Sequence, residues 1–256
     1  MKKHSDGKVE ILVANTEMGQ GALTALRKIV AETLEIQFDD VIYELPDTDR
    51  VPDSGPTVAS RTTMIVGGLL KKAAEEMRER WNEADEFEIM KKYRHPDYIR
   101  WNQETFEGDA YPTYSFGANV AEVDVDTITG EIAVRHIWAV FDVGITIDEV
   151  LMRGQAQGGV VQGTGYATIE VMEAQAGRLL QSTITDYTIP TAKDVPLVEC
   201  AFIDNPYEYG PFGAKCAGEL TLVGAAPAIA AAVENAIGRE IVKIPIKPEE
   251  IIKKLD

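Results

Sequence analysis

Three loops that contain glycine, each directly before a helical pattern, constrain what this chain can fold into. They lie at residues 19–21, 55–60 and 210–218. A helix N-terminus presents unpaired backbone N–H groups, and glycine lets that backbone approach a ligand closely. A single Gly-Gln-Gly is most often a turn, but three such loops together favour a large ligand that carries phosphate groups. No Gly-Lys-Ser or Gly-Lys-Thr follows any of them, and no GxGxxG motif follows the first strand, so the common nucleotide-binding motifs are not indicated.

The hydrophobic pattern of the first part of the chain predicts a strand, a helix and a second strand, followed by a long loop and another helix. Apolar residues recur at helical spacing in residues 22–34, while residues 8–14 alternate as in a strand. Thr62 or Thr63 is expected to cap the second helix. Residues 81–101 are expected to continue this helix and then to form a surface connection. The predicted elements are strands at 8–14 and 41–45, a loop at 47–60 and helices at 22–34 and 64–80.

The second part of the chain begins with a predicted hairpin and continues with a glycine-rich helix. Glycines inside that helical pattern indicate close packing of the helix on a ligand or on another backbone. Strands and helices do not alternate strictly, which predicts an α+β fold with mixed sheets and packed helices in two lobes, residues 1–110 and residues 111–256. The predicted elements are strands at 114–126, 131–140, 179–185 and 197–203 and helices at 154–172, at 219–237 and from 248 onward.

The chain is acidic, with a formal charge of −17 from 42 acids and 25 bases among 256 residues. This charge argues against nucleic acid or an anionic membrane surface as a partner, because their phosphate groups would be repelled. Residues 1–10 are charged and contain no apolar stretch like that of a signal peptide, and the apolar run at 220–233 is too short to span a bilayer. We therefore expect a soluble, cytoplasmic protein.

Few side chains are candidates for chemistry. The two cysteines, Cys200 and Cys216, are too few for an iron–sulfur cluster or a disulfide framework, and the three histidines lack zinc-site spacing. Glu219, directly before an apolar helix, is either an acid that complements the helix dipole or a general base held in a pocket. Lys215, four residues earlier, is either a charge partner or a solvated lysine.

Four segments of the chain carry a resemblance to a known family. In chain order they are Glu17-Met18-Gly19-Gln20-Gly21 with Thr24, Pro56–Arg61, Gly154–Gly165 and Gly213–Glu219. Their order and spacing resemble the molybdopterin-binding subunit of the xanthine dehydrogenase/aldehyde oxidase group of molybdenum hydroxylases, over nearly the whole chain. The resemblance covers the C-terminal part of that subunit and includes no counterpart of its N-terminal half.

The resemblance implies a role for each matching residue. Glu219 would be the general base, and Gln155 would sit beside an oxygen ligand of the metal. Ala59 would approach the molybdenum closely without being a side-chain ligand. The other implied cofactor-binding residues, which would contact the pterin, the dinucleotide or the phosphates, are Gly19, Gln20, Gly21, Thr57, Ser60, Arg61 and Thr62.

The resemblance also implies an activity. The chain would be the C-terminal molybdopterin-binding part, or a split subunit, of an enzyme that hydroxylates a purine, another N-heterocycle or an aldehyde with water-derived oxygen. Its cofactor would be molybdenum–molybdopterin in the cytosine dinucleotide form. A complementary chain would supply the N-terminal half of the subunit, and iron–sulfur and flavin (FAD) partner subunits would accept the electrons. Residues 1–110 would form the first lobe of the cofactor-binding domain and residues 111–256 the second.

Two alternatives to this function remain open. The chain could be a cofactor-free scaffold or binding module that keeps the fold, or a phosphate-binding enzyme of unrelated chemistry, for which it shows no nucleophile or Walker-type motif. The chain also departs from the family pattern in ways that leave its substrate open. Cys216 stands where glycine is usual, Leu220 where proline is common, and Asp148-Glu149 where Asn-Pro is frequent.

Overall fold

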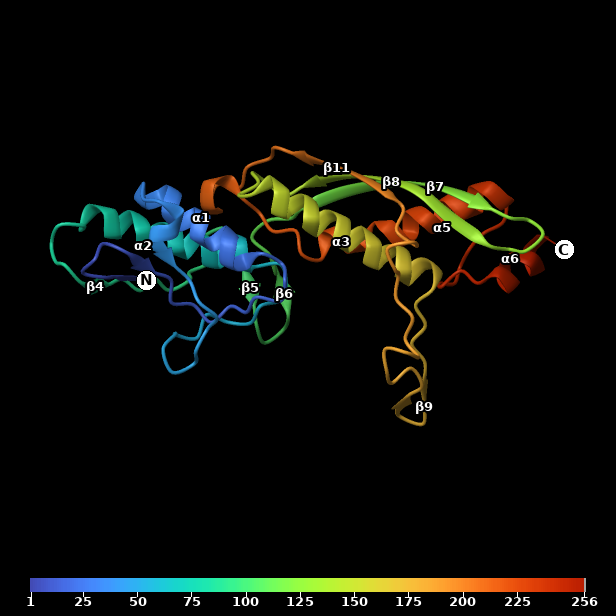
Figure 1. The fold of residues 1–256 in the computed structure, drawn as a ribbon, viewed down its shortest axis with the longest axis horizontal. Coiled ribbons are helices and arrows are strands. Elements are labelled where there is room, and N and C mark those ends of the chain that lie inside the picture. Colours follow the sequence, from blue (N-terminus) through green and yellow to red (C-terminus); the bar gives the residue numbers. More distant parts are fainter. Residues whose placement is uncertain (256) are drawn as a thin grey trace. The chain divides into compact units, whose positions relative to one another are not determined.

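The computed structural model describes residues 1–255, which form helices and short mixed sheets in an α+β fold (Figure 1). The fold class predicted from the sequence is thereby confirmed. The chain divides into two units, of which unit 1 consists of residues 1–115, 142–151 and 203–216, and unit 2 is the rest of the described chain. The sequence-based lobes, residues 1–110 and 111–256, refer to the cofactor-binding domain and stay a prediction.

The main sheet of unit 1 has four short strands in the order β3-β2-β1-β4. β1 pairs antiparallel with β2 and β4, whereas β2 pairs in parallel with β3. The strands predicted at 8–14 and 41–45 are shorter in the structure, and the backbone N–H of Ala14 donates to the Ser54 hydroxyl instead of to a strand. The strands are β1 (Lys2–Lys3), β2 (Val9–Glu10), β3 (Val41–Ile42) and β4 (Phe87–Glu88), with β5 (Trp101–Asn102) and β6 (Glu107–Gly108) in a separate pair.

Helices α1 (Ala22–Leu34) and α2 (Gly67–Glu79) pack on one another and carry the core of unit 1. α1 covers the range that its periodicity predicts. Leu26 and Ile29 of α1 and Met77 of α2 are fully buried, and burial of side chains of this size contributes about 1.5–3 kcal/mol each. Two short 3-10 helices complete the unit, η1 (Phe38–Asp40) and η3 (Pro211–Gly213).

A π-helical turn, Thr62–Val66, leads directly into α2. The residue before this turn is Arg61 and the residue before α2 is Val66, so the predicted cap at Thr62 or Thr63 is wrong. The Thr62 hydroxyl instead accepts a hydrogen bond from the Asn15 side chain at 3.3 Å. The Thr62 hydroxyl, which the local sequence predicts to cap the helix, therefore binds the side chain of Asn15, a residue distant in the sequence.

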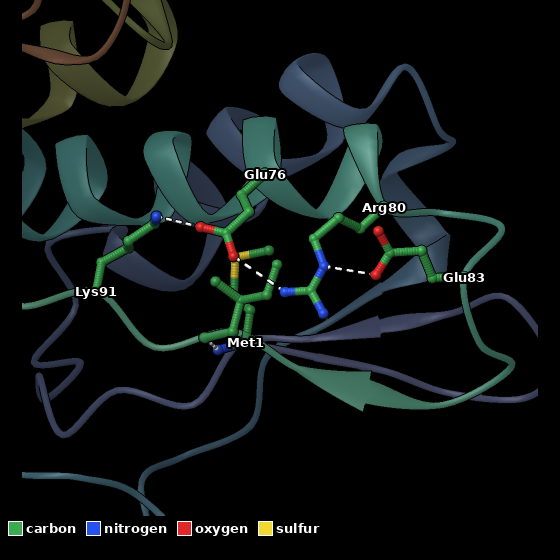
Figure 2. Close-up of polar contacts among 6 residues, drawn as sticks. Met1, Glu76, Arg80, Glu83 and Lys91 are labelled. Atoms are coloured by element: carbon green, nitrogen blue, oxygen red, sulfur yellow. Dashed lines mark hydrogen bonds and ion pairs between the residues drawn. The ribbon is translucent and has the colours of Figure 1, made fainter.

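The predicted continuation of α2 into residues 81–101 is also wrong. At Arg80 the chain leaves the helical conformation and turns into β4, which pairs with β1. The outer face of α2 carries ion pairs in which Glu76 accepts hydrogen bonds from Arg80 and Lys91, while Arg80 also binds Glu83 at 2.8 Å (Figure 2). These bonds tie the returning chain to the helix, and those from Lys91 and Arg80 lower the pKa of the Glu76 carboxyl.

The sheet of unit 2 has the strand order β11-β8-β7. β7 (Phe116–Val125) and β8 (Ile132–Asp142) form the predicted hairpin, and the backbone N–H of Asp126 donates to the carbonyl of Glu131 across its turn. β11 (Leu197–Ile203) covers the range that the sequence predicts. Strand alternation and the turn residues were therefore sufficient to predict this hairpin from the sequence.

The helix predicted at 219–237 is divided at Gly224 into α4 (Leu220–Val223) and α5 (Ala225–Ile237). α5 lies against β7 (Figure 1). A Cβ atom on Gly224 would lie 1.9 Å from Nδ2 of Asn119 on β7, so a larger residue at this position would require the Asn119 side chain to move. The final helix, α6 (Pro248–Leu255), begins where the sequence predicts.

The segment Leu220–Ile237 is 18 residues long and, by length and mean hydropathy, apolar enough to cross a membrane. This finding differs from the expectation that the run is too short. In the structure, α5 packs on β7, and its residues Ile229 and Val233 are fully buried. The core helix of a folded domain passes the same test of length and composition.

α3 (Glu149–Thr168) begins and ends earlier than the helix predicted at 154–172. The Asp148 carboxylate accepts a hydrogen bond from the backbone N–H of Leu151 at 2.9 Å, as an N-cap aspartate does. The strand predicted at 179–185 is wrong for most of its length. Only β10 (Arg178–Leu179) forms, paired with β9 (Ala174–Gln175) in a small hairpin that projects away from α3 (Figure 1).

Candidate functional site

The loop before α1 is shaped by a carboxylate that the sequence analysis did not single out. Glu17 accepts hydrogen bonds from the backbone N–H groups of Gly19, Gly21 and Leu23 at 2.8, 2.9 and 3.0 Å. Burial alone would raise the pKa of the Glu17 carboxyl, but these backbone hydrogen bonds outweigh it and lower the pKa. The helix N-terminus therefore already holds a negative charge from its own chain.

Gln20 folds back onto the same loop. Its Nε2 donates to the carbonyl of Thr16 at 2.8 Å, and its Oε1 accepts from the backbone N–H of Met18 at 2.6 Å. Gly19 and Gly21 on either side have φ values of 101° and 86°, a left-handed conformation that favours glycine. The loop thus has a fixed shape, and the predicted cofactor contacts of these residues stay a prediction.

The second predicted cofactor loop lies against the first within unit 1. The Thr57 hydroxyl accepts a hydrogen bond from the backbone N–H of Thr16 at 2.9 Å. The Asn15 side-chain amide reaches both ends of the second loop, with its Nδ2 3.4 Å from the Thr57 hydroxyl and 3.3 Å from the Thr62 hydroxyl. The second motif is therefore joined to the residues that directly precede the first motif, through the side chain of Asn15 and the backbone N–H of Thr16.

Ala59 and Ser60 both have positive φ, at 53° and 46°. Such a conformation is uncommon for residues with a Cβ and costs of order 1–3 kcal/mol each, so the surrounding contacts must impose it. Arg61 supplies part of that constraint, because its guanidinium donates to the carbonyls of Ser54 and Pro56 at 2.9 and 3.1 Å. The strain lies at the residue that the sequence analysis expects closest to a metal.

Asn15 is fully buried between the two loops, and its Oδ1 has no hydrogen-bond partner among the described residues. An unpaired buried acceptor is costly and fits a ligand that brings a donor. The backbone carbonyl of Asn15 accepts a hydrogen bond from the Tyr43 hydroxyl at 3.2 Å. Burial and the nearby Glu17 carboxylate raise the pKa of Tyr43 to about 12, so this hydroxyl stays a donor at neutral pH.

A cavity of about 650 Å³ in unit 1 lies beside the second loop. Ser54, Gly55 and Arg61 form part of its wall, and the buried side chains of Val66 and Leu70 form part of its apolar floor. This volume is in the range of small-molecule sites. Across residues 1–255, no group of three or more His, Cys, Asp or Glu side chains could hold a metal ion.

The first part of the fourth motif reaches the π-helical turn that follows the second loop, through a thiol. Sγ of Cys216 accepts a hydrogen bond from the backbone N–H of Met64, in the π-helical turn, at 3.1 Å. The carbonyl of Cys216 accepts a hydrogen bond from the Ser115 hydroxyl. The departure from the family's glycine at this position therefore has a structural role. Unit 1 brings together the first motif, the second motif and the start of the fourth.

The third motif lies on α3 in unit 2, where its glycines allow close packing on α4 and α5. A Cβ on Gly159 would lie 2.2 Å from Oγ1 of Thr221, and a Cβ on Gly163 would lie 2.7 Å from the carbonyl oxygen of Leu222. The prediction that these glycines mark close backbone approach is confirmed. Gln155 lies one turn before Gly159 on the same face of α3.

Glu219 directly precedes α4, and its carboxylate makes no capping hydrogen bond to that helix. The side chain is exposed. Thr221, two residues later, is buried against Gly159, which fixes the start of α4 on α3. Gln155, one turn before Gly159, and Glu219, two residues before Thr221, both belong to unit 2. A carboxylate at this position has the chemistry of a proton acceptor.

The sequence and the fold of this chain are similar to those of known proteins. The model of the molybdopterin cofactor-binding domain family matches residues 1–93 and 85–196. A probable xanthine dehydrogenase subunit of Bacillus subtilis is 28% identical over 98% of this chain. The 6-hydroxypseudooxynicotine dehydrogenase complex subunit gamma of Paenarthrobacter nicotinovorans is 28% identical over 97% of it. The solved structure of the aldehyde oxidoreductase from Desulfovibrio gigas is similar to this chain, with a TM-score of 0.84 over 99% of the chain, at 24% identity.

The chain is much shorter than these relatives. It spans 38% and 36% of the two curated relatives and 30% of the Desulfovibrio gigas chain. The matched region contains the loops and helices described above, whereas most of each relative has no counterpart in the chain.

Proposed function

Since the chain belongs to the molybdopterin cofactor-binding domain family, in the molybdenum hydroxylase group, we propose that it is the C-terminal cofactor-binding part, or a split subunit, of a molybdenum-dependent oxidoreductase. The enzyme hydroxylates a purine, another N-heterocycle or an aldehyde with oxygen derived from water. The observation that carries this proposal is the junction of two cofactor motifs through Thr57 and Asn15, which leaves a buried acceptor between them.

The cofactor in this proposal is molybdenum–molybdopterin in the cytosine dinucleotide form, which supplies a two-electron redox centre when bound. The residues of the two joined loops bind it, and Ala59 leaves room for the closest approach because its side chain is small. Arg61 supplies a local positive charge against the field of a chain with net charge −17. The binding set is Gly19, Gln20, Gly21, Thr57, Ser60, Arg61 and Thr62, with Gln155 on α3.

Glu219 is the general base in this proposal. Its carboxylate takes up the proton of the water-derived oxygen that attacks the substrate carbon. Gln155 orients groups of the cofactor through its amide. The substrate itself is recognised largely by residues outside this chain.

The proposal includes partner chains. In the split-subunit form of the proposal, a complementary chain supplies the N-terminal half of the molybdenum subunit; this chain spans 38% and 36% of two curated relatives. Iron–sulfur and flavin subunits carry the electrons away, since two cysteines cannot hold an iron–sulfur cluster. We propose a cytoplasmic location for the assembly.

The test has two parts. Purification of the complex from the native host, followed by metal analysis and acid hydrolysis, is expected to show stoichiometric molybdenum and release of CMP. Glu219→Gln is then expected to abolish turnover while molybdenum content stays at the wild-type level. Glu131→Gln, a change of an exposed acid in the turn between β7 and β8, is the matched control and should leave turnover unchanged. A complex without molybdenum would favour the cofactor-free scaffold instead, and a fully active Glu219→Gln would remove the base assignment.

A further inference from the structure

Lys215 and Asp142 form a buried ion pair. From the sequence, Lys215 is expected to be either a charge partner or a solvated lysine. Nζ of Lys215 lies 2.8 and 3.0 Å from the two carboxylate oxygens of Asp142, and the two side chains are only 5% and 8% exposed. Asp142 also accepts hydrogen bonds from the Asn205 amide at 2.7 Å and from the backbone N–H of Gly144. Lys215 further donates to the carbonyl of Tyr114 at 3.2 Å. Lys215 is thus a charge partner, of Asp142, and not a solvated lysine.

The backbones around this pair are also joined. The N–H of Lys215 donates to the carbonyl of Val143 at 2.9 Å, and the N–H of Ile145 donates to the carbonyl of Gly213 at 3.1 Å. A Cβ on Gly144 would lie 2.3 Å from the oxygen of Gly213, so the two segments touch at main-chain distance. The segment 213–216 is therefore held on the segment 142–145 by both main chain and charge.

The residues that form hydrogen bonds around this ion pair all lie close in sequence to points where the chain passes from one unit to the other. The path of the chain passes between unit 1 and unit 2 at residues 115/116, 141/142, 151/152, 202/203 and 216/217. Tyr114, Asp142, Asn205 and Lys215 all belong to unit 1, and each lies within three residues of a different one of these passages. The buried pair Asp142–Lys215, with its hydrogen-bond partners at Tyr114 and Asn205, therefore gathers the unit 1 ends of four passages.

We propose that the Asp142–Lys215 pair is a positioning clamp that fixes the place from which the chain continues to Glu219. Glu219 lies four residues beyond Lys215. Buried ion pairs contribute little net stability compared with apolar pairs, but they demand one geometry because both charges must stay paired. The clamp would therefore define the path of the 213–219 segment. Its consequence for turnover rests on the proposed function, whereas its effect on the segment does not.

The first test measures hydrogen exchange in residues 213–219 of the full chain. Three variants are compared with wild type: Lys215→Met, the double change Asp142→Leu/Lys215→Met, and Arg135→Met, which removes the cation of an exposed pair with Asp124. Without the clamp, amides of 213–219 are expected to exchange about tenfold faster, while those of α1 keep wild-type rates. The control should change neither region.

The double variant keeps the test decisive if Lys215→Met does not fold, because it leaves no unpaired charge in the core. Faster exchange in 213–219 of a folded double variant would support a clamp that depends on the charge pair. Wild-type exchange in that segment, in either folded variant, would overturn the proposal.

The second test uses the assembled enzyme with its molybdenum content measured. Lys215→Met, or the double variant, is expected to lower kcat by about tenfold or more while KM changes less than about twofold, because the base is misplaced and substrate contacts are kept. An unchanged kcat with fast exchange in 213–219 would overturn the positioning role. If Glu219→Gln were fully active, the assignment of Glu219 as the base would fail, and the hydrogen-exchange result would still test the clamp.

Discussion

The Glu17 carboxylate accepts a hydrogen bond from the backbone N–H of Gly21 at 2.9 Å, at the residue that directly precedes α1. This contact changes the interpretation of a glycine loop before a helix. Such a loop suggests an open site for an external anion, yet here the chain supplies an anion of its own. The loop is therefore preformed, and a ligand that binds it meets a fixed shape and a nearby negative charge.

We expect Glu17→Ala to lower the free energy of unfolding of the chain by about 0.5–2 kcal/mol, the usual cost of losing a helix cap. The variant removes the acceptor of three backbone N–H groups. Urea denaturation followed by circular dichroism measures the effect. Glu35→Ala, at an exposed acid just after α1, is the control and should cost less than Glu17→Ala. Equal losses in the two variants would contradict the capping role.

Glu17 should also give unfolding a pH dependence in the acid range. Its pKa is lowered in the folded chain because backbone hydrogen bonds outweigh the effect of burial. A lowered pKa means that this contribution is fully present above the unfolded pKa, about 4.3, and is lost as the pH falls through the folded value. The difference in unfolding free energy between pH 7 and pH 3 should therefore be smaller in Glu17→Gln than in wild type. An identical difference would show that Glu17 does not titrate in this way.

The sequence predicted those parts of the fold that depend on local pattern. The periodicity of residues 22–34 gave the bounds of α1, and the alternation of residues 197–203 gave those of β11. The strand at 8–14 was overestimated, because Ser54, forty residues away, takes the N–H that a longer strand would need. The continuation of α2 failed for a similar reason, since pairing of β4 with β1 reverses the chain.

The candidate site, like the fold, was predictable only where it depends on local sequence. Motif spacing pointed to the loops, but nothing local showed that Asn15 joins two of them or that Glu17 fills the first. The partner of Lys215 is Asp142, 73 residues earlier, and no periodic pattern links the two positions. An acid shortly before a glycine turn is the one signal that could have identified Glu17.

Removal of one member of the buried pair should be costly. We expect Lys215→Met to lower the free energy of unfolding by about 3–5 kcal/mol, because the Asp142 carboxylate would remain buried without its counter-charge. Arg135→Met, which breaks an exposed pair, should cost about 0–1 kcal/mol. Urea denaturation of both variants measures the difference. A loss for Lys215→Met as small as that of the control would mean that Asp142 becomes solvated when its partner is removed.

The double change Asp142→Leu/Lys215→Met should recover much of that loss. Apolar side chains of similar volume often replace a buried ion pair without a net cost. The Asn205 amide would lose its acceptor on Asp142, which limits the recovery. A double-mutant cycle on unfolding free energies measures the coupling between the two positions, and additive losses would exclude a direct interaction.

Two neighbouring glycines of α3 allow a sharp test of the helix contact beside Glu219. A Cβ on Gly159 would lie 2.2 Å from Oγ1 and 2.8 Å from the backbone carbon of Thr221, whereas a Cβ on Gly158 would have nothing within 4 Å. Gly159→Ala should therefore destabilise the chain by about 1–3 kcal/mol through overpacking. Gly158→Ala should be neutral or stabilise it by up to about 1 kcal/mol, because alanine favours the helix. Thermal unfolding of both variants measures the difference. Destabilisation by both changes would mean that α3 tolerates a Cβ at neither position, and that the contact with Thr221 is not the cause.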